Sequence, residues 1–192
     1  MRENMKTAII YGTTTGTSRK IAKIIASKLK GEVITIPVSK AKDTCLLKYD
    51  FIIIGGSIHS GRIQSSIKSY VSRNSKTLKG INYGLYLSCL SETKGEKYLM
   101  DSFGEDIVEA AFIADTFGGE LNPNEGSYIT RQKTKRIIKK WKNKGRIPEI
   151  KMERIEHFTN EINNKVENRP LECTQSIAAV QLYKLSDTSV LA

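Results

Sequence analysis

Short apolar segments alternate along this chain with longer segments whose apolar residues recur at helical spacing. The short segments are rich in Ile, Val and Tyr, and most of them stop at a glycine or a proline. Such alternation is typical of βαβ units, in which parallel strands form one sheet with helices on both faces. The predicted strands are 6–11, 32–38, 50–54, 83–90 and 111–117, and the predicted helices are 18–30, 63–71, 97–110 and 151–166.

These elements predict one small doubly wound α/β domain over residues 1–167. A chain of 192 residues with 39% hydrophobic content is long enough to bury a single sizeable core. In folds of this class, ligands bind at the carboxyl ends of the strands. Functional residues are therefore expected in the loops that follow Tyr11, Ile54, Cys89 and Asp115. The tail, residues 168–192, contains no motif, and no function is assigned to it.

Composition argues against several other classes of protein. No apolar run approaches the roughly 20 residues that span a bilayer, and the run after Lys6 is cut at Gly12, too early for a signal peptide. The protein is therefore expected in the cytoplasm. Three cysteines without CxxC spacing argue against a disulfide framework or a zinc cluster. With two histidines and no carboxylate cluster at ligand spacing, no metal site is expected.

The turn from Gly12 to Ser18 joins the first predicted strand to the first helix and carries five hydroxyl side chains and two glycines. A helix start offers unpaired backbone N–H groups and a partial positive charge, and glycine lets the backbone approach a phosphate closely. The turn therefore predicts a phosphate cradle that needs no lysine. It is neither a Walker loop nor the GxGxxG fingerprint. The alternative is a Thr/Ser-rich N-cap before an ordinary helix.

The same turn, from Tyr11 to Ser18, resembles the phosphate loop of flavodoxins, in which Ser and Thr side chains surround the phosphate of FMN. The resemblance implies a flavodoxin-like fold, with strand order 2-1-3-4-5 and FMN as the cofactor. Thr17 stands where flavodoxins frequently carry Asn. By this resemblance the phosphate is held by Thr13, Thr14, Thr15, Gly16, Thr17 and Ser18.

A second segment, from Gly55 to Gly61, resembles the glycine-rich loop that lies over the flavin ring. It is similar to the Gly-Ala-Ser-Ile-x-x-Gly block of the menaquinone-dependent protoporphyrinogen dehydrogenases, which are flavodoxin-like enzymes. His59 and Ser60 stand where these families often place Tyr or Trp. The resemblance implies flavin contacts from Ser57, Ile58, His59, Ser60 and Gly61.

His59 is the one candidate for a catalytic group. A histidine beside a flavin can donate a hydrogen bond or a proton as electrons arrive. The alternative is an exposed polar loop residue. His157 falls near the apolar face of the last predicted helix and is interpreted as a structural residue.

The segment after the fourth predicted strand approaches the pyrimidine edge of the flavin by the same resemblance. It implies contacts from Ser88, Cys89, Leu90 and Ser91. Cys89 has no base beside it in the sequence. We therefore interpret this cysteine as the end of a buried strand and not as a nucleophile.

Residues 131–146 contain nine Lys or Arg and no acid, which leaves the rest of the chain at +2 of a net charge of +11. A narrow apolar stripe accompanies them: Ile129, Ile137, Ile138 and Trp141. A basic amphipathic helix with tryptophan at its boundary favours contact of residues 130–146 with an anionic membrane surface. One alternative is a solvated face whose stripe packs on the domain. Nucleic acid is the third option, and the loops lack the stacking aromatics that would favour it.

The position of this basic segment also bears on the family. It lies in an insertion, about residues 120–148, between the fifth strand and the last helix. Protoporphyrinogen dehydrogenases resemble flavodoxins but carry an added basic stretch at that place. The resemblance implies an FMN-dependent oxidoreductase of haem biosynthesis, which passes electrons from a reduced tetrapyrrole to a membrane quinone. The basic helix would then receive anionic lipid at the inner face of the membrane, or the propionates of the substrate.

Two other functions stay open at this point. A flavodoxin-type electron carrier would shuttle electrons between protein partners and would have no small-molecule substrate of its own. Such carriers are usually acidic, so the charge of this chain counts modestly against this function. From a different class, the chain could be a non-catalytic module that binds phosphate or nucleic acid and has lost flavin.

Overall fold

The computed structural model describes residues 5–42, 44–91, 93–125, 127–143 and 148–167. Five parallel strands form one sheet in the order β2-β1-β3-β4-β5, which confirms the predicted doubly wound topology. Strands β2 and β3 lie on opposite sides of β1, so the direction of the strand order reverses at β1. Such folds bind ligands at this reversal. The strands are β1 (Lys6–Tyr11), β2 (Glu32–Pro37), β3 (Phe51–Ser57), β4 (Tyr83–Ser88) and β5 (Ile113–Thr116).

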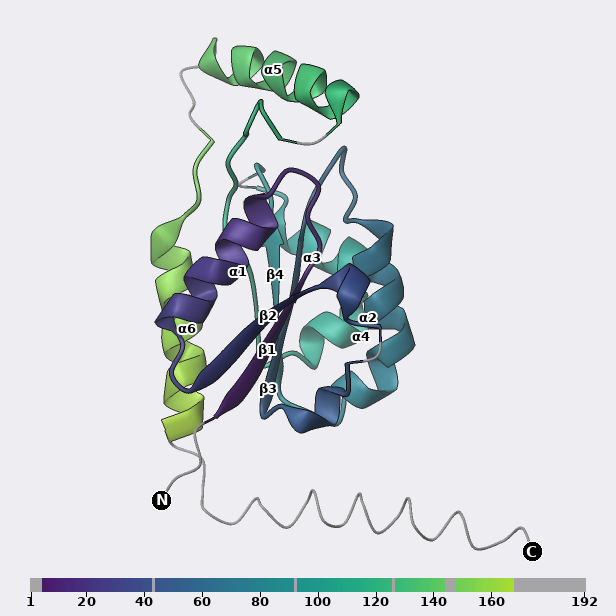
Figure 1. Ribbon diagram of the computed structural model, residues 1–192, viewed down its shortest axis with the longest axis vertical. Coiled ribbons are helices and arrows are strands. Elements are labelled where there is room, and N and C mark those ends of the chain that lie inside the picture. The colour runs from purple at the N-terminus through teal and green to yellow at the C-terminus, as the bar shows by residue number, and fades with distance from the viewer. Residues whose placement is uncertain (1–4, 43, 92, 126, 144–147, 168–192) are drawn as a thin grey trace, which may run out of the picture.

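Helices cover both faces of this sheet. Figure 1 shows α1 and α6 on one face and α2, α3 and α4 on the other, while α5 lies apart, beyond the carboxyl ends of the strands. Two short 3₁₀ turns, Val38–Lys40 and Leu46–Lys48, follow β2. The helices are α1 (Thr17–Lys28), α2 (Ser65–Leu78), α3 (Gly95–Phe103), α4 (Glu105–Glu109), α5 (Tyr128–Lys142) and α6 (Met152–Glu167).

The core consists of two clusters, one on each face of the sheet. Successive residues of a strand point to opposite faces, so Ile53 packs in the cluster under α1 and α6, while Ile52 and Ile54 pack under α2 and α3. Every residue of β3 is buried. The continuous apolar run predicted for a strand covered on both faces is thereby confirmed.

Several predicted boundaries are corrected by the structure. The fourth strand, expected over 83–90, ends at Ser88, and the fifth, expected over 111–117, spans Ile113–Thr116. The helix expected over 97–110 is two helices, because Gly104 adopts φ 92° and ends α3 one residue before α4 begins. The helix expected over 63–71 begins two residues later and continues to Leu78. The third strand, expected to stop at Ile54, continues to Ser57.

The glycine at position 55 of β3 leaves room for a side chain of the neighbouring strand β4. Gly55 pairs with Tyr86, and the aromatic ring lies where a side chain on residue 55 would have to be. The ring of Tyr86 also stacks on Phe117, with centroids 5.7 Å apart. Its hydroxyl donates a hydrogen bond of 2.9 Å to the carbonyl of Ser18, in the first turn of α1. Tyr86 therefore ties the sheet core to the helix that follows the Thr-rich turn.

Candidate functional site

A cavity of about 330 Å³ lies at the carboxyl edge of the sheet, where the loops after β1, β3, β4 and β5 meet. Nine of the residues predicted to bind the cofactor line it, so residues as far apart in sequence as Thr14 and Leu90 converge, as the fold class predicts. These nine are Thr14, Thr15, Thr17, Ser57, Ile58, His59, Ser60, Ser88 and Leu90.

The other six predicted binding residues do not line this cavity. Cys89 and Ser91 line a second, smaller cavity. Gly61 lies in the turn after Ser60, with φ 80°. Thr13 and Gly16 lie in the turn before α1, and Ser18 lies in its first turn; none of the three lines the cavity. For these six, contact with a cofactor stays a prediction.

The Thr-rich turn does not cap its helix with a hydroxyl. The N-cap of α1 is Gly16, which has φ 78° and leaves the helix without a side-chain cap. The N-cap alternative from the sequence is therefore wrong for this turn. The hydroxyl oxygens of Thr13 and Ser18 are buried and have no hydrogen-bond partner among the described residues. Buried hydroxyls without partners are costly. Thr7 and Tyr70 also carry such hydroxyls, but only those of Thr13 and Ser18 lie in the segment that the sequence predicts to hold a phosphate.

An acidic segment after β5 packs against the same turn. The backbone carbonyl of Glu120 accepts a hydrogen bond of 3.1 Å from Thr17 Oγ1, and its carboxylate pairs with Lys20 at 2.6 Å. Arg19 lies 3.7 Å from the carboxylate of Glu125. That carboxylate also lies against Gly16, where a Cβ would collide with it. A negative group thus sits at the positive end of α1, a position that favours anions.

His59, the candidate catalytic group, lines the cavity and is held by Ser57. Its Nε2 lies 3.0 Å from Ser57 Oγ, and its backbone forms an antiparallel bridge with Arg62. The side chain still reaches solvent, but partial burial of the ring lowers the pKa of His59 below its ordinary value. The shift favours the neutral imidazole.

Helix α5 forms the far wall of the cavity, which sequence reasoning missed. Thr130, Lys133, Thr134 and Ile137 line the cavity from α5, and Thr134 is only 4% exposed. Their spacing of three and four residues marks one helix face. That face was the signal available in the sequence, and the surrounding positive charge obscured it.

The apolar stripe expected along the basic segment does not share one environment. Ile137 lines the cavity, whereas Ile129 is 66% exposed and Trp141 lines the second cavity. Helix α5 carries seven exposed cations, of which Lys133 also lines the cavity, and the remaining two basic residues, at 144 and 146, lie outside the described residues. The seven are Arg131, Lys133, Lys135, Arg136, Lys139, Lys140 and Lys142.

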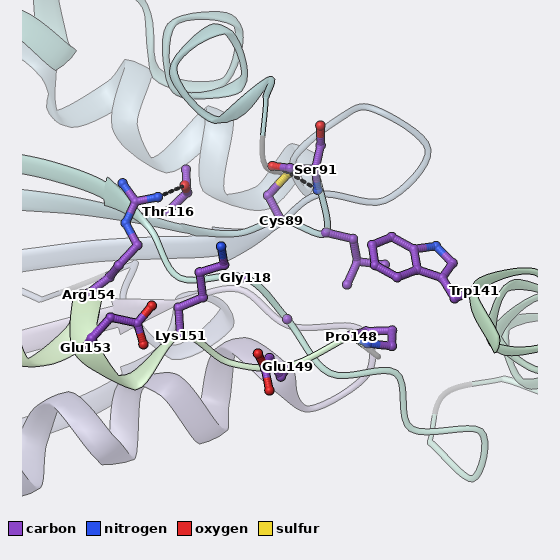
Figure 2. Close-up of a pocket in the computed structure, with 12 residues that line it drawn as sticks. Cys89, Ser91, Thr116, Gly118, Trp141, Pro148, Glu149, Lys151, Glu153 and Arg154 are labelled. Carbon is purple, nitrogen blue, oxygen red and sulfur yellow. Dashed lines mark hydrogen bonds between the residues drawn. The ribbon is translucent and has the colours of Figure 1, made fainter. Parts of the chain in front are cut away.

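The second cavity, of about 140 Å³, adjoins the first through Leu90 and Gly119, which line both. Figure 2 shows Trp141 reaching in from α5 and Arg154 from the start of α6. Arg154 pairs with the carboxylate of Asp115 and donates a hydrogen bond of 3.3 Å to Thr116. This ion pair fastens α6 to the end of β5.

Cys89 also lines this second cavity, and its surroundings suit a structural thiol. Its sulfur accepts a hydrogen bond of 3.3 Å from the backbone N–H of Ser91. Burial raises the pKa of the Cys89 thiol, with only partial compensation from that hydrogen bond. A protonated thiol is a poor nucleophile, in agreement with the interpretation from the sequence. In the part of the chain that the structure describes, no three metal-ligating side chains cluster.

Comparisons with known proteins agree with this fold. The chain is 31% identical over 96 residues to the protoporphyrinogen IX dehydrogenase [quinone] of Escherichia coli, an alignment that covers 48% of this chain and 53% of that protein. The chain thus spans about half the length of the curated relatives that it matches. Within the described ranges, no helix has the length and apolarity to cross a bilayer.

Two solved structures are similar to the chain at low identity. The Megasphaera elsdenii flavodoxin has a TM-score of 0.46 and 18% identity, over 57% of this chain and 84% of that one. A Lactobacillus acidophilus flavoprotein in complex with FMN has a TM-score of 0.44 and 16% identity, over 58% and 93%. The family assignment comes from a flavodoxin-domain family model, which matches residues 8–147, more than half of the chain. The chain therefore belongs to the flavodoxin family.

Proposed function

We propose that this chain is an FMN-dependent oxidoreductase whose cavity at the carboxyl edge of the sheet holds the cofactor. FMN is the cofactor of the flavodoxin family. The observation that carries the proposal for this site is the pair of buried, unpartnered hydroxyls of Thr13 and Ser18, beside a cavity lined by Thr14, Thr15 and Thr17. A phosphate supplies the acceptor oxygens that these donors lack.

The residues of the cavity suit the two ends of the cofactor. The phosphate would be held by the turn 13–18, through hydroxyls and the backbone N–H groups at the positive end of α1. The flavin ring would lie between the segments 57–60 and 88–90, with α5 opposite. Bound FMN supplies reversible uptake of two electrons, and the chain supplies orientation and exclusion of water.

For the substrates we propose a reduced tetrapyrrole as electron donor and a membrane quinone as acceptor. The support is the likeness to the Escherichia coli protoporphyrinogen IX dehydrogenase [quinone], which is named for these two substrates. Lys133 lines the cavity from α5, and a cation at that position suits a substrate that carries propionate groups. Each round removes two electrons and two protons from the tetrapyrrole and delivers them to the quinone.

We further propose that α5 brings the protein to an anionic membrane surface, where the quinone resides. Its seven exposed cations lie on a helix without any acid. Tyr128 and Ile129, at the start of the helix, are 69% and 66% exposed, which leaves apolar area for the headgroup region. The same helix lines the cavity, so membrane contact and the cofactor site share one element.

The proposed function is tested by purification followed by turnover. We expect a yellow protein with a flavin spectrum that oxidises protoporphyrinogen with a menaquinone analogue as acceptor. A colourless protein that does not respond to added FMN would overturn the cofactor assignment. A yellow protein that passes electrons only to a protein partner would instead establish the electron-carrier function.

Glu125→Gln is expected to tighten FMN binding. The carboxylate of Glu125 lies against Gly16 and repels a phosphate that approaches the turn, and its removal also frees Arg19 for the phosphate. Unit charges about 4 Å apart in water interact by about 1 kcal/mol, so FMN should bind roughly 3- to 10-fold more tightly at low salt. Quenching of FMN fluorescence measures the affinity.

Glu109→Gln is the matched control for this prediction. Glu109 is an exposed residue of α4, and its substitution makes the same change in net charge. Its affinity for FMN should equal that of the wild type. Equal affinities for all three proteins, or a gain that does not shrink as salt is added, would show that Glu125 does not oppose the phosphate.

A further inference from the structure

Gln64, the residue before α2, lies half-buried beside the ends of β1 and β3. Two glycines make room for its amide: a Cβ at Gly56 would lie 2.8 Å from Gln64 Oε1, and one at Gly12 would lie 3.4 Å from the same atom. Neither motif of the sequence includes Gln64. Its side chain hydrogen-bonds Ser57, which lines the cavity, so Gln64 can influence the cavity as well as pack against the strands.

The orientation of the Gln64 amide follows from the backbone. The N–H of Ser57 lies 3.2 Å from Gln64 Oε1, and a backbone N–H can only donate. The atom that faces it must therefore be the amide oxygen. The amide nitrogen of Gln64 then faces Ser57 Oγ at 2.7 Å and donates a hydrogen bond to it.

The hydroxyl of Ser57 links the amide of Gln64 to the ring of His59, so the direction of the first hydrogen bond bears on the direction of the second. Ser57 is 4% exposed, and its oxygen lies between Gln64 Nε2 and His59 Nε2. Because Gln64 donates to this oxygen, the hydroxyl hydrogen is left for another acceptor, and His59 Nε2 at 3.0 Å is the acceptor within reach on this side of Ser57. A histidine nitrogen that accepts carries no proton, so the proton of the neutral ring is on Nδ1.

We propose that Gln64 is a positioning residue that, through Ser57, holds His59 in the tautomer with its proton on Nδ1. His59 then serves the cavity as a hydrogen-bond donor, not as a base at Nε2. The partner is an acceptor atom of the ligand in the cavity, and only the identity of that ligand rests on the proposed function. The lowered pKa of His59 agrees with a neutral ring.

Gln64→Glu tests this proposal because it reverses the chain of hydrogen bonds. A carboxylate only accepts, so the hydroxyl of Ser57 donates to it and its oxygen becomes an acceptor for Nε2–H of His59. We expect nitrogen NMR of the ring, at about pH 8 where an imidazole is neutral, to show the proton on Nδ1 in the wild type. In Gln64→Glu the proton should move to Nε2, and in Gln64→Leu the two tautomers should mix.

Two controls keep the result specific. Gln132→Glu makes the same substitution at an exposed position of α5 that does not line the cavity, and should keep the wild-type tautomer. In Ser57→Ala the link is gone, so adding Gln64→Glu should not move the proton. A proton on Nε2 in the wild type, or an unchanged tautomer in Gln64→Glu, would overturn the proposal.

This measurement is independent of turnover. The ring nitrogens are observed in the FMN-free chain and again after FMN is added, and the tautomer should be the same in both. A failure of the proposed function would appear as a missing flavin spectrum, while the tautomer result would stand. Wild-type protein alone is enough to contradict the proposal, so a variant that fails to fold does not leave it untested.

Discussion

Tyr86→Ala is expected to lower the free energy of unfolding by about 3–5 kcal/mol, the range for truncating a buried aromatic side chain. Tyr86 is fully buried, stacks on Phe117 and lies directly against Gly55 of the neighbouring strand. Truncation leaves a cavity between β3, β4 and α1 that the sheet cannot close. Urea denaturation of the FMN-free protein measures the change.

Tyr86→Phe separates the ring from its hydroxyl. The phenol donates to the carbonyl of Ser18 at 2.9 Å, and burial raises the pKa of Tyr86, so the group stays a donor. Loss of this one hydrogen bond should cost about 1 kcal/mol, with the ring packing intact. If Tyr86→Ala costs no more than Tyr86→Phe, the ring does not support the core as described.

Reversal of three charges on α5, Lys139, Lys140 and Lys142 to Glu, is expected to abolish binding to anionic vesicles. Each cation near such a surface contributes about 1 kcal/mol, so loss of three weakens binding by roughly 100-fold, and the new negative charges add repulsion. None of the three residues lines the cavity, so the FMN content should not change. Vesicle co-sedimentation at several salt concentrations measures the effect.

The matched control reverses three exposed cations on α2, Lys68, Arg73 and Lys76. This variant has the same net charge, and its substitutions lie on the face of the sheet covered by α2, away from α5 (Figure 1). It should keep most of the vesicle binding. Equal loss in both variants would show an effect of total charge, and equal binding of the wild type to neutral vesicles would contradict a role for the cations of α5.

Local pattern was enough to predict the sheet and the edge at which the cavity lies. In a run such as Phe51 to Ile54, consecutive apolar side chains point to both faces of the sheet. They all leave water when helices cover both faces, so a buried parallel strand follows from the residues themselves. The Thr-rich turn is likewise readable, since its chemistry depends on a helix start within the same short segment. Boundaries were less readable: Gly104 divides a helix that side-chain periodicity treats as continuous.

The shape of the site depends on contacts between distant segments, which no local pattern contains. The basic run on α5 indicates an exposed helix, yet Thr134 is buried because that helix closes over loops more than 70 residues earlier in the chain. Gln64 shows no motif, and its role arises only because Gly12 and Gly56 leave space for its amide beside Ser57. Secondary structure and the class of ligand follow from hydrophobic period and turn chemistry, which are local. The wall of the cavity and the direction of its hydrogen bonds follow from packing across the sheet, which only the folded chain brings about.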